Sequence, residues 1–438
     1  MKNVKLYKWL TVTLMLSISV FCLMYLEKTK YVSAPAVAET GGEKTLSPDV
    51  PKPPEKPIYY NVLPRSAFSY NGEKWQNIGG DKDETLKAVH TFNKNTYVFF
   101  DTSSNGYDVK TTVPSVACAL INSDLTLQKT ATLTSKNIER FLSSKITKDG
   151  FVVLTKSSDY LALYKMNFDL IVQKKEVFDT AENGALYLLS NGKILTISST
   201  KTSLTIRIVG DDLSIEKSSS LYLSSPEISM IFEKDESLNL FVNLENGFAH
   251  IRYSDFFGFL SSDEYPDKKI ADILPFHGGF SGIYQKNGKS YAFTADENMV
   301  VANEKPLGEP TLSRIFKSGE NLIIVTSEND KSTSTLYCRH LDEVVATSFS
   351  FPVKDAPYYD ESTGQIALFD GEYVTLYSVR SLDFQILSKY PVSSSTFKMT
   401  AGGIVAFSTN KKDGAFNKNF GESDVFITIL NNKTTPKF

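Results

Sequence analysis

The sequence predicts an all-β fold, a β-propeller, from three observations. Short apolar segments recur eight times between residues 96 and 408, at intervals of 38 to 54 residues. Each is followed by a second strand-like segment, and tight polar turns separate the strands. Aromatic residues make up 12% of the chain, mostly Phe and Tyr, which suits pleated strands. Units of about 40–45 residues with several short strands are typical of propeller blades, which bury both faces only by packing around an axis.

Eight copies predict eight blades. The apolar segments are TYVFFD, FVVLTK, KILTIS, LNLFVN, FSGIYQ, LIIVTS, QIALFD and GIVAFS. The segments that follow them are VACALI, LALYKM, LTIRIV, FAHIRY, SYAFTA, TLYCRH, YVTLYS and VFITIL. A seven-bladed ring is the alternative, if residues 231–272 are irregular. Little chain follows the last copy, so we expect Arg65–Ile78 to supply its outer strand and to join the two ends.

The turns of the repeat have their own signatures, with strands lettered A to D outward from the axis. The A–B turns contain glycine, which tolerates the positive φ of tight hairpins. These glycines are Gly150, Gly192, Gly279, Gly319, Gly364 and Gly403. The C–D turns contain an acidic residue, at Asp124-Leu125, Asp169-Leu170 and Asp212-Leu213, with Asp342 and Asp383 in the corresponding places of later copies.

One copy resembles a known family. Lys148–Leu170 reads KDGFVVLTKSSDYLALYKMNFDL, in which an Asp-Gly-Phe-Val-Val turn and strand precede a Lys-x-Asn-x-Asp turn. This stretch is similar to the repeats of bacterial extracytoplasmic β-propeller proteins. The clear similarity covers one copy, and the full Trp-Asp signature of WD40 repeats and the sialidase Asp box do not occur. That family includes scaffolds, binding modules and some enzymes, so the resemblance implies a fold and no particular function.

The N-terminal segment predicts membrane attachment. Three lysines precede an uncharged apolar run of 18 residues, Trp9–Leu26, which is near the lower limit for a membrane-spanning helix. The basic side is expected to stay in the cytoplasm. We therefore expect a cytoplasmic N-terminus (1–8), a transmembrane signal anchor (9–26), a proline-rich stalk (27–57) and a propeller domain (58–438), in a single-pass cell-membrane protein. Cleavage near Ala36–Ala38 is the alternative, and both place the propeller outside the cytoplasm.

The composition argues against several classes of function. A net charge of −3 provides no electrostatic basis for binding nucleic acid. Cys118 and Cys338 fall in copies that are not adjacent, so we expect two small buried residues rather than a disulfide. The four histidines are far apart in the sequence, so neither a metal nor another cofactor is expected.

The stretch ILPFHGGFSG, Ile273–Gly282, looks like part of a hydrolase oxyanion loop. Such a loop accompanies a Gly-x-Ser-x-Gly nucleophile elbow, which the sequence lacks. The repeat instead places His277-Gly278-Gly279 in the A–B turn of the fifth copy. There the glycines have a backbone role, and His277 is expected to have no partner.

Two B–C loops are long: Asp101–Ser115 in copy one and Ser408–Asp424 in copy eight, which become neighbours when the ring closes. Aromatic residues among Asn, Lys and Asp are typical of recognition surfaces. The predicted binding residues are Tyr107, Asp108, Lys110, Lys412, Asp413, Phe416, Asn417 and Phe420. The alternative is a pair of polar loops without a ligand, since long insertions cost little.

These observations favour a non-catalytic, membrane-anchored scaffold that binds a protein or glycan partner. The alternative is an envelope carbohydrate-active enzyme with a carboxylate pair in the central funnel. The acidic candidates are Asp255, Asp263, Glu264 and Asp267, for which turn and loop positions suit the sequence better. The aromatic residues of that stretch, Phe256, Phe257, Phe259 and Tyr265, are expected to divide between the core and a contact patch.

Overall fold

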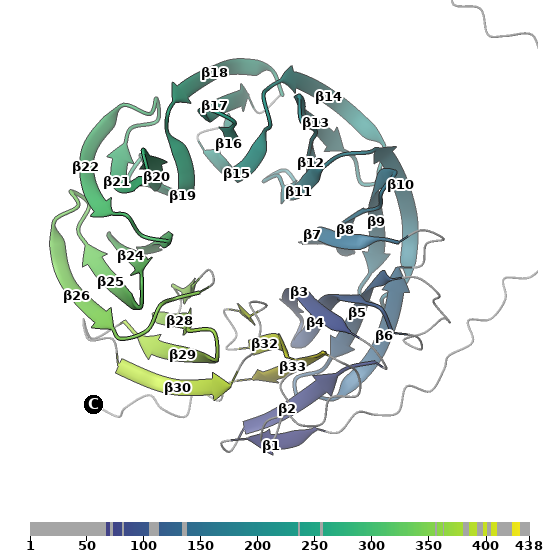
Figure 1. Ribbon diagram of the computed structural model, residues 1–438. Coiled ribbons are helices and arrows are strands. Elements are labelled where there is room, and N and C mark those ends of the chain that lie inside the picture. The colour runs from purple at the N-terminus through teal and green to yellow at the C-terminus, as the bar shows by residue number, and fades with distance from the viewer. Residues whose placement is uncertain are drawn as a thin grey trace, which may run out of the picture. The chain divides into compact units, whose positions relative to one another are not determined.

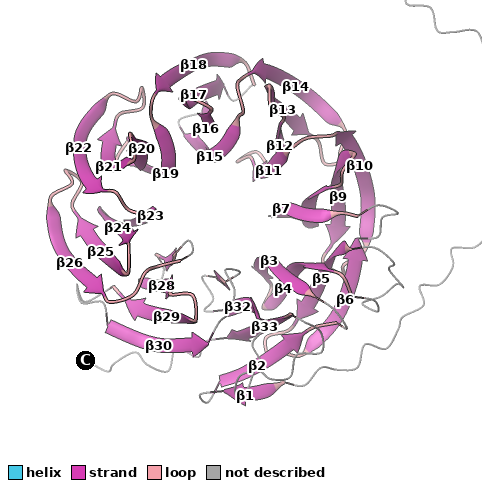
Figure 2. Cartoon of the chain, in the orientation of Figure 1, coloured by secondary structure: helices cyan, strands magenta, loops and turns pink. Residues whose placement is uncertain are grey.

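The computed structural model describes residues 67–70, 73–80, 83–104, 114–133, 138–234, 237–254, 257–354, 357–361, 363–379, 385–391, 397–400, 404–409 and 423–429. The regular elements in these ranges are all β-strands (Figure 2), which confirms the predicted all-β class. Within the same ranges no helix is long and apolar enough to cross a membrane. The predicted anchor at 9–26 and stalk at 27–57 lie outside the described residues.

The strands form eight sheets that surround a central axis as the blades of a propeller (Figure 1). In blades 1 to 7 the four strands follow one another outward in chain order, each antiparallel to the next. Strand A therefore faces the axis and strand D lies on the outer rim. The eight-bladed prediction is confirmed, and residues 231–272 contribute regular strands to blades 4 and 5 rather than an irregular segment.

Blades 1 to 4 occupy the first half of the propeller. Blade 1 contains β3 (Glu84–Phe92), β4 (Asn95–Thr102), β5 (Ser115–Ile121) and β6 (Leu127–Leu133). Blade 2 contains β7 (Arg140–Thr147), β8 (Gly150–Lys156), β9 (Tyr160–Asn167) and β10 (Val172–Asp179). Blade 3 contains β11 (Asn183–Leu188), β12 (Ile194–Ser199), β13 (Ser203–Val209) and β14 (Ile215–Tyr222). Blade 4 contains β15 (Glu227–Lys234), β16 (Ser237–Leu244), β17 (Gly247–Ser254) and β18 (Phe259–Pro266).

Blades 5 to 8 complete the ring. Blade 5 contains β19 (Lys269–Phe276), β20 (Gly279–Lys286), β21 (Lys289–Ala295) and β22 (Val301–Gly308). Blade 6 contains β23 (Leu312–Ser318), β24 (Asn321–Glu328), β25 (Lys331–Tyr337) and β26 (Glu343–Phe349). Blade 7 contains β27 (Tyr358–Asp360), β28 (Gln365–Phe369), β29 (Tyr373–Ser378) and β30 (Gln385–Pro391). Blade 8 contains β31 (Lys398–Met399), β32 (Ile404–Thr409), β33 (Asp424–Ile429), β2 (Glu73–Ile78) and β1 (Phe68–Tyr70).

Blade 8 joins the two ends of the propeller. Its sheet has the order β31-β32-β33-β2-β1, so two N-terminal strands complete a sheet begun by three C-terminal ones. Figure 1 shows the purple β1 and β2 beside the yellow-green β33. β2 pairs antiparallel with β33 from Trp75↔Thr428 to Ile78↔Val425. The predicted closure by residues 65–78 is thereby confirmed.

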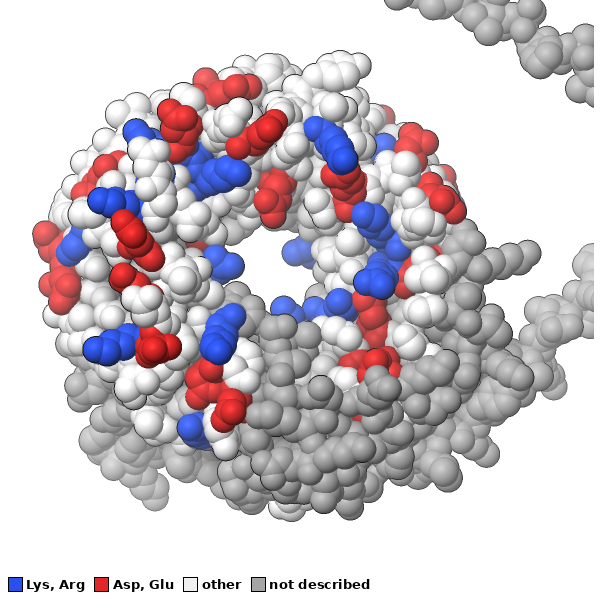
Figure 3. Space-filling model, in the orientation of Figure 1, with Lys and Arg blue, Asp and Glu red and all other residues white. Residues whose placement is uncertain are grey.

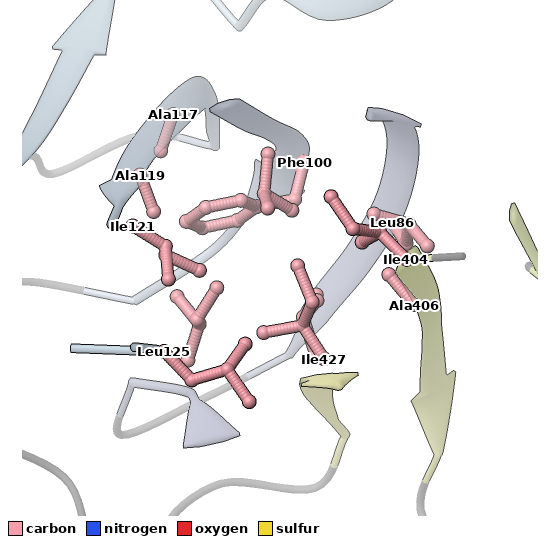
Figure 4. Packing of buried hydrophobic residues seen from close by; sticks show 12 residues of the cluster. Leu86, Phe100, Ala117, Ala119, Ile121, Leu125, Ile404, Ala406 and Ile427 are labelled. Carbon is pink, nitrogen blue, oxygen red and sulfur yellow. The ribbon is translucent and has the colours of Figure 1, made fainter. Parts of the chain in front are cut away.

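Each junction between neighbouring blades contains its own apolar cluster. The eight clusters draw their buried residues from the pairs 8/1, 1/2, 2/3, 3/4, 4/5, 5/6, 6/7 and 7/8. Alternate residues of a strand point to opposite faces, so both faces of each central strand must be apolar to fill two junctions. This explains runs such as FVVL in β8. Figure 4 shows the junction of blades 8 and 1, where Phe100 packs near Ile404 and Ile427.

The turns divide between two faces of the ring. We call the face with the A–B and C–D turns the turn face, and the face with the B–C and D–A connections the loop face. The A–B turn of blade 5 is the pair His277-Gly278, whose φ values of 45° and 81° fit a type I′ hairpin. Gly279 is needed for a different reason from the one predicted: a Cβ there would lie 1.9 Å from the Ala295 carbonyl oxygen.

The C–D turns place an apolar residue in the left-handed conformation. The residues concerned have φ between 59° and 65° and are buried: Leu125, Leu170, Leu213, Met299 and Leu341. Such backbone strain costs about 1–2 kcal/mol for an L-residue, and burial of the side chain between blades offsets it. The sequence pattern predicts the acidic residue directly before this apolar residue, but in blade 6 the residue before Leu341 is His340 and Asp342 follows it. Asp383 lies outside the described residues.

Candidate functional site

The eight predicted binding residues lie outside the described residues, within 105–113 and 410–422. The described chain reaches Ser104 and Thr409 before these loops and resumes at Pro114 and Ser423 after them. Because blades 1 and 8 are neighbours, the bases of both loops lie on the loop face at one junction. The structure therefore locates the bases of the predicted site.

Glu84 connects the two loop bases. It is the first residue of β3, and its side chain is fully buried. Its carboxylate accepts hydrogen bonds from the Gly80 N–H (2.8 Å), the Thr102 hydroxyl (3.0 Å) and the Ser104 hydroxyl. Its own N–H donates to the Ser423 carbonyl oxygen (2.8 Å). One residue thus holds the start of the blade 1 loop and the end of the blade 8 loop.

A second carboxylate accompanies Glu84. Asp424, the first residue of β33, is fully buried and accepts a hydrogen bond from the Asn77 amide (2.9 Å). The pKa of Glu84 is raised to about 7, chiefly by burial and to a smaller extent by the negative charge of Asp424, while the hydrogen bonds that Glu84 accepts oppose both effects. A Cβ at Gly79 would lie 2.2 Å from the Asp424 Cγ, so glycine permits the close approach. We call Glu84, Asp424 and their hydrogen-bond partners the seam network.

A third buried carboxylate, Glu139, lies beside the end of the blade 1 loop. Its N–H donates to the Pro114 carbonyl oxygen (3.3 Å). Its carboxylate accepts hydrogen bonds from Thr155 (2.7 Å), Tyr160 (2.8 Å), Tyr164 (2.8 Å) and Lys175 (2.9 Å). Burial and the Glu139 charge raise the pKa of Tyr164 well above its ordinary value. The blade 1 loop therefore has a buried, hydrogen-bonded carboxylate at each end.

Two more carboxylates connect neighbouring blades close to the axis. Asp101 accepts the Phe141 N–H (2.8 Å) and pairs with Lys87 (3.2 Å). Asp272 accepts the Ile315 N–H (3.0 Å). Burial raises the pKa of both carboxyl groups. Their bonds satisfy backbone donors of the innermost strands, which is a structural role.

The ring has an open centre, which Lys and Arg side chains border in the view of Figure 3. A glycosidase needs two carboxylates about 5–10 Å apart that a substrate can reach. In the described part of the chain, Glu84, Glu139 and Asp424 are fully buried. That same part contains no group of three or more His, Cys, Asp or Glu side chains suited to a metal ion.

Two of the acidic candidates of blade 4 lie on its outer strand, away from the axis. Asp263 and Glu264 are exposed on β18, the outermost strand, where adjacent residues point to opposite faces. Asp267 occupies a turn with φ of 62°. Asp255 and Phe256 lie outside the described residues. Among the aromatic residues, Tyr265 stacks on Phe248 in the core, and Phe259 is 53% exposed; the contact patch stays a prediction.

His277 and the cysteines require corrections. The A–B turn assignment of His277 is confirmed, but the expectation that it has no partner is wrong, because its Nε2 lies 3.3 Å from a carboxylate oxygen of Glu320. Glu320 occupies the equivalent turn of blade 6, so the pair connects two blades. Cys118 and Cys338 are free thiols, and Cys118 is buried as expected. Cys338 is partly exposed, because it lies just past β25 in a turn.

A cavity that the repeat pattern does not predict opens on the turn face between blades 3 and 4. Its volume is about 630 Å³. Buried leucine and isoleucine side chains and the half-buried Phe257 form its apolar wall. The polar wall contains Ser190, Asn191, Lys193, Glu216, Lys217, Glu233 and Lys234. We call this the blade 3/4 cavity.

The seam network and the cavity also escape sequence interpretation. Glu84 lies in the highly charged stretch DKDETLK, which is typical of an exposed turn. The exposed-looking polar residues of the blade 3 A–B turn give no sign of a cavity. The one usable signal was topological: ring closure brings residues near 80 and 424 together.

Comparisons with known proteins place the fold and no more. No family model matches the chain, and no curated protein matches it in sequence. Among solved structures, the chain is similar to the Dos1 propeller (TM-score 0.57, 8% identity, 84% of this chain and 95% of that chain). It is also similar to the dihydro-heme d1 dehydrogenase NirN (TM-score 0.52, 13% identity, covering 83% of this chain and 77% of that chain).

A third similar structure is that of a prolyl endopeptidase (TM-score 0.50, 9% identity). The match covers 76% of this chain and 54% of the endopeptidase chain. The three neighbours bear different names and functions, and their identities with this chain are low. They support the fold-level resemblance to propeller repeat proteins predicted from Lys148–Leu170, and they leave function to the site itself.

Proposed function

We propose that this protein is a membrane-anchored extracytoplasmic β-propeller that binds a protein or glycan partner without catalysis. The observation that carries the proposal is the seam network. Two long loops start and end at one junction, where buried hydrogen bonds hold their bases. A binding site needs recognition residues on a rigid support. This junction supplies the support for the three predicted residues of the blade 1 loop, Tyr107, Asp108 and Lys110, and for the five of the blade 8 loop.

The proposal of a non-catalytic function rests on the burial and hydrogen bonding of the carboxylates. Glu84, Asp424 and Glu139, the fully buried carboxylates that the structure describes near the loop bases, all accept hydrogen bonds from the propeller itself. A fully buried group cannot touch a substrate, so the seam network orients loops rather than performing chemistry. The carbohydrate-active enzyme of the alternative would require accessible carboxylates, and the described residues offer no specific observation in its favour.

The binding proposal is tested by shortening the loops. In the full chain, residues 105–113 and 410–422 are each replaced by Asn-Gly, the two-residue B–C turn of blade 5. A matched control replaces Asn329-Asp330, the B–C turn of blade 6, by the same dipeptide. We expect pull-downs from an envelope fraction and a glycan array to lose their partner with the loop variant alone. Unchanged binding by the loop variant would contradict the proposal.

The location proposal rests on the apolar run Trp9–Leu26 and the stalk that follows it. We expect the full chain to remain in the membrane pellet after an alkaline wash, and the propeller to be accessible to protease added to intact cells. A variant lacking residues 9–26 should appear in the soluble fraction. Recovery of the full chain in the cytoplasm would contradict the proposal.

A further inference from the structure

The blade 3/4 cavity has the size and shape of a small-ligand site. Its volume is about 630 Å³, within the roughly 300–1,000 Å³ typical of such sites. A second cavity of about 380 Å³ shares Asn191, Lys193 and Glu216 with it and continues toward blade 2. The two together form an elongated hollow on the turn face, opposite the predicted loops.

The apolar wall has an aromatic end. Phe257 is half-buried and lines the cavity, and its ring stacks on that of Tyr253 at 4.9 Å between centroids and 14° between planes. Phe259, which is 53% exposed, contacts the same Tyr253 ring edge-on. A flat apolar face of this kind packs well against the C–H face of a ring that is otherwise polar.

The polar wall offers donors and acceptors together. Lys193 and Glu216 form an ion pair, and Glu233 accepts hydrogen bonds from the Ser190 N–H (2.6 Å) and hydroxyl (3.4 Å). Lys234 donates to the Gly278 carbonyl oxygen. The charged side chains named for this wall are three lysines and two glutamates, so a strongly charged ligand would meet little net opposite charge. A neutral ligand with many hydroxyl groups suits such a wall.

The cavity does not suit an extended peptide. Its walls come from blades whose strands B and C are paired on both sides, and the free edges of the end strands β14 and β15 face the rim and the axis rather than the junction. No open strand edge therefore faces the cavity for backbone pairing. From these observations we propose that the blade 3/4 cavity binds a neutral oligosaccharide, with a sugar ring on Phe257 and hydroxyl groups on the Lys193–Glu216 pair. This site is separate from the loops of the proposed function.

The test is isothermal titration calorimetry of the full chain in a detergent without a sugar headgroup. The probes are the N-acetylglucosamine tetramer and cellotetraose, with tetragalacturonate as an anionic comparison of similar size. We expect at least one neutral probe to bind with a Kd of about 1 mM or tighter, and the anionic probe to bind about tenfold more weakly.

Two variants locate the binding. Phe257→Gly removes the ring and suits the backbone, since φ is 62°. Met299→Gly is the matched control, because Met299 occupies the same turn position in blade 5 with φ of 61° and does not line the cavity. The double exchange Lys193→Glu/Glu216→Lys keeps the ion pair but inverts it. We expect Phe257→Gly and the exchange to weaken binding at least tenfold, and Met299→Gly to leave it unchanged.

The outcomes separate this inference from the proposed function. Binding that survives both the Phe257→Gly variant and the exchange overturns the cavity assignment, as does the absence of neutral-probe binding at 10 mM or so. Binding that is lost only when the loops are replaced also overturns it, and would assign the saccharide to the loop face. Loss in the Phe257→Gly variant with retention in the loop variant supports the cavity whatever the fate of the loop proposal.

Discussion

Glu84 should make the closure of the propeller sensitive to pH. Its pKa is about 7 in the folded protein against 4.5 ordinarily, so the folded state binds this proton more tightly than the unfolded chain. The stabilising contribution is therefore fully present below pH 4.5 and is lost as the pH rises through about 7. At about 1.4 kcal/mol for each pKa unit, the loss amounts to about 3 kcal/mol.

The variant Glu84→Gln isolates this contribution. The glutamine is neutral at every pH; its carbonyl can accept the Gly80 N–H, and its amide can donate to the Thr102 and Ser104 hydroxyls. Other titrating groups, such as His90 and His250, are the same in both proteins and cancel in the difference. We therefore expect the variant to gain stability over the wild type as the pH rises from 5 to 8.

The magnitude is measurable by thermal unfolding. For cooperative unfolding of about 380 residues, an entropy near 2.1 cal/mol/K per residue makes 3 kcal/mol worth roughly 4 °C. Circular dichroism melts of both proteins at pH 5, 6, 7 and 8 should show the difference in Tm growing by about that amount. Ser104→Ala removes a hydrogen bond that lowers the pKa of Glu84 and should move the pH window upward. A difference in Tm that stays constant from pH 5 to pH 8 would refute the reasoning.

Three further predictions concern stability. Glu139→Gln leaves the Lys175 ammonium, which is 30% exposed, without its counter-charge and should lower the free energy of unfolding by about 2–3 kcal/mol. A decrease below about 0.5 kcal/mol in denaturant unfolding would show that the ion pair contributes little to stability. Trp75→Ala empties a fully buried site in the closing strand β2 and should cost about 3–5 kcal/mol, with faster amide exchange concentrated in blade 8; uniform exchange around the ring would contradict this. At Leu213, where φ is 62°, the glycine variant of the protein should be more stable than the alanine variant by about 1 kcal/mol. At Leu204, which lies in an extended strand, the alanine variant should be the more stable of the two. The same order of stability at both sites would contradict the explanation given for the C–D turns.

The repeat could be predicted because each central strand must be apolar on both faces. That requirement left a visible mark in runs such as FVVL of β8 and LIIV of β24. Ring closure was predictable for a related reason, since Arg65–Ile78 contains a strand pattern with no other partner. The turn containing His277-Gly278 could also be placed, because tight hairpins restrict φ and glycine satisfies that restriction.

The remaining features depend on contacts between residues distant in the sequence. Glu84 is flanked by charged residues, and its contacts with Ser423 and Asp424 exist only because the closed ring brings them near. The blade 3/4 cavity depends on how side chains of two blades fail to fill a junction, and no local pattern records this. The left-handed leucines contradict the ordinary preference of that conformation for glycine and asparagine, so only their packing explains them.

The seam between blades 8 and 1 combines apolar packing with buried, hydrogen-bonded carboxylates. It has an apolar cluster like every other junction, yet it also buries two carboxylates whose negative charges repel each other. Burying a charge costs free energy unless hydrogen bonds compensate, and an apolar pair would close the ring at lower cost. The Glu84 carboxylate instead accepts hydrogen bonds from Thr102 and Ser104 at the base of the blade 1 loop. The backbone N–H of the same residue donates to the Ser423 carbonyl oxygen at the end of the blade 8 loop. In the proposed binding function, these contacts hold the bases of the two long loops in a fixed relation, which closure of the ring alone would not require.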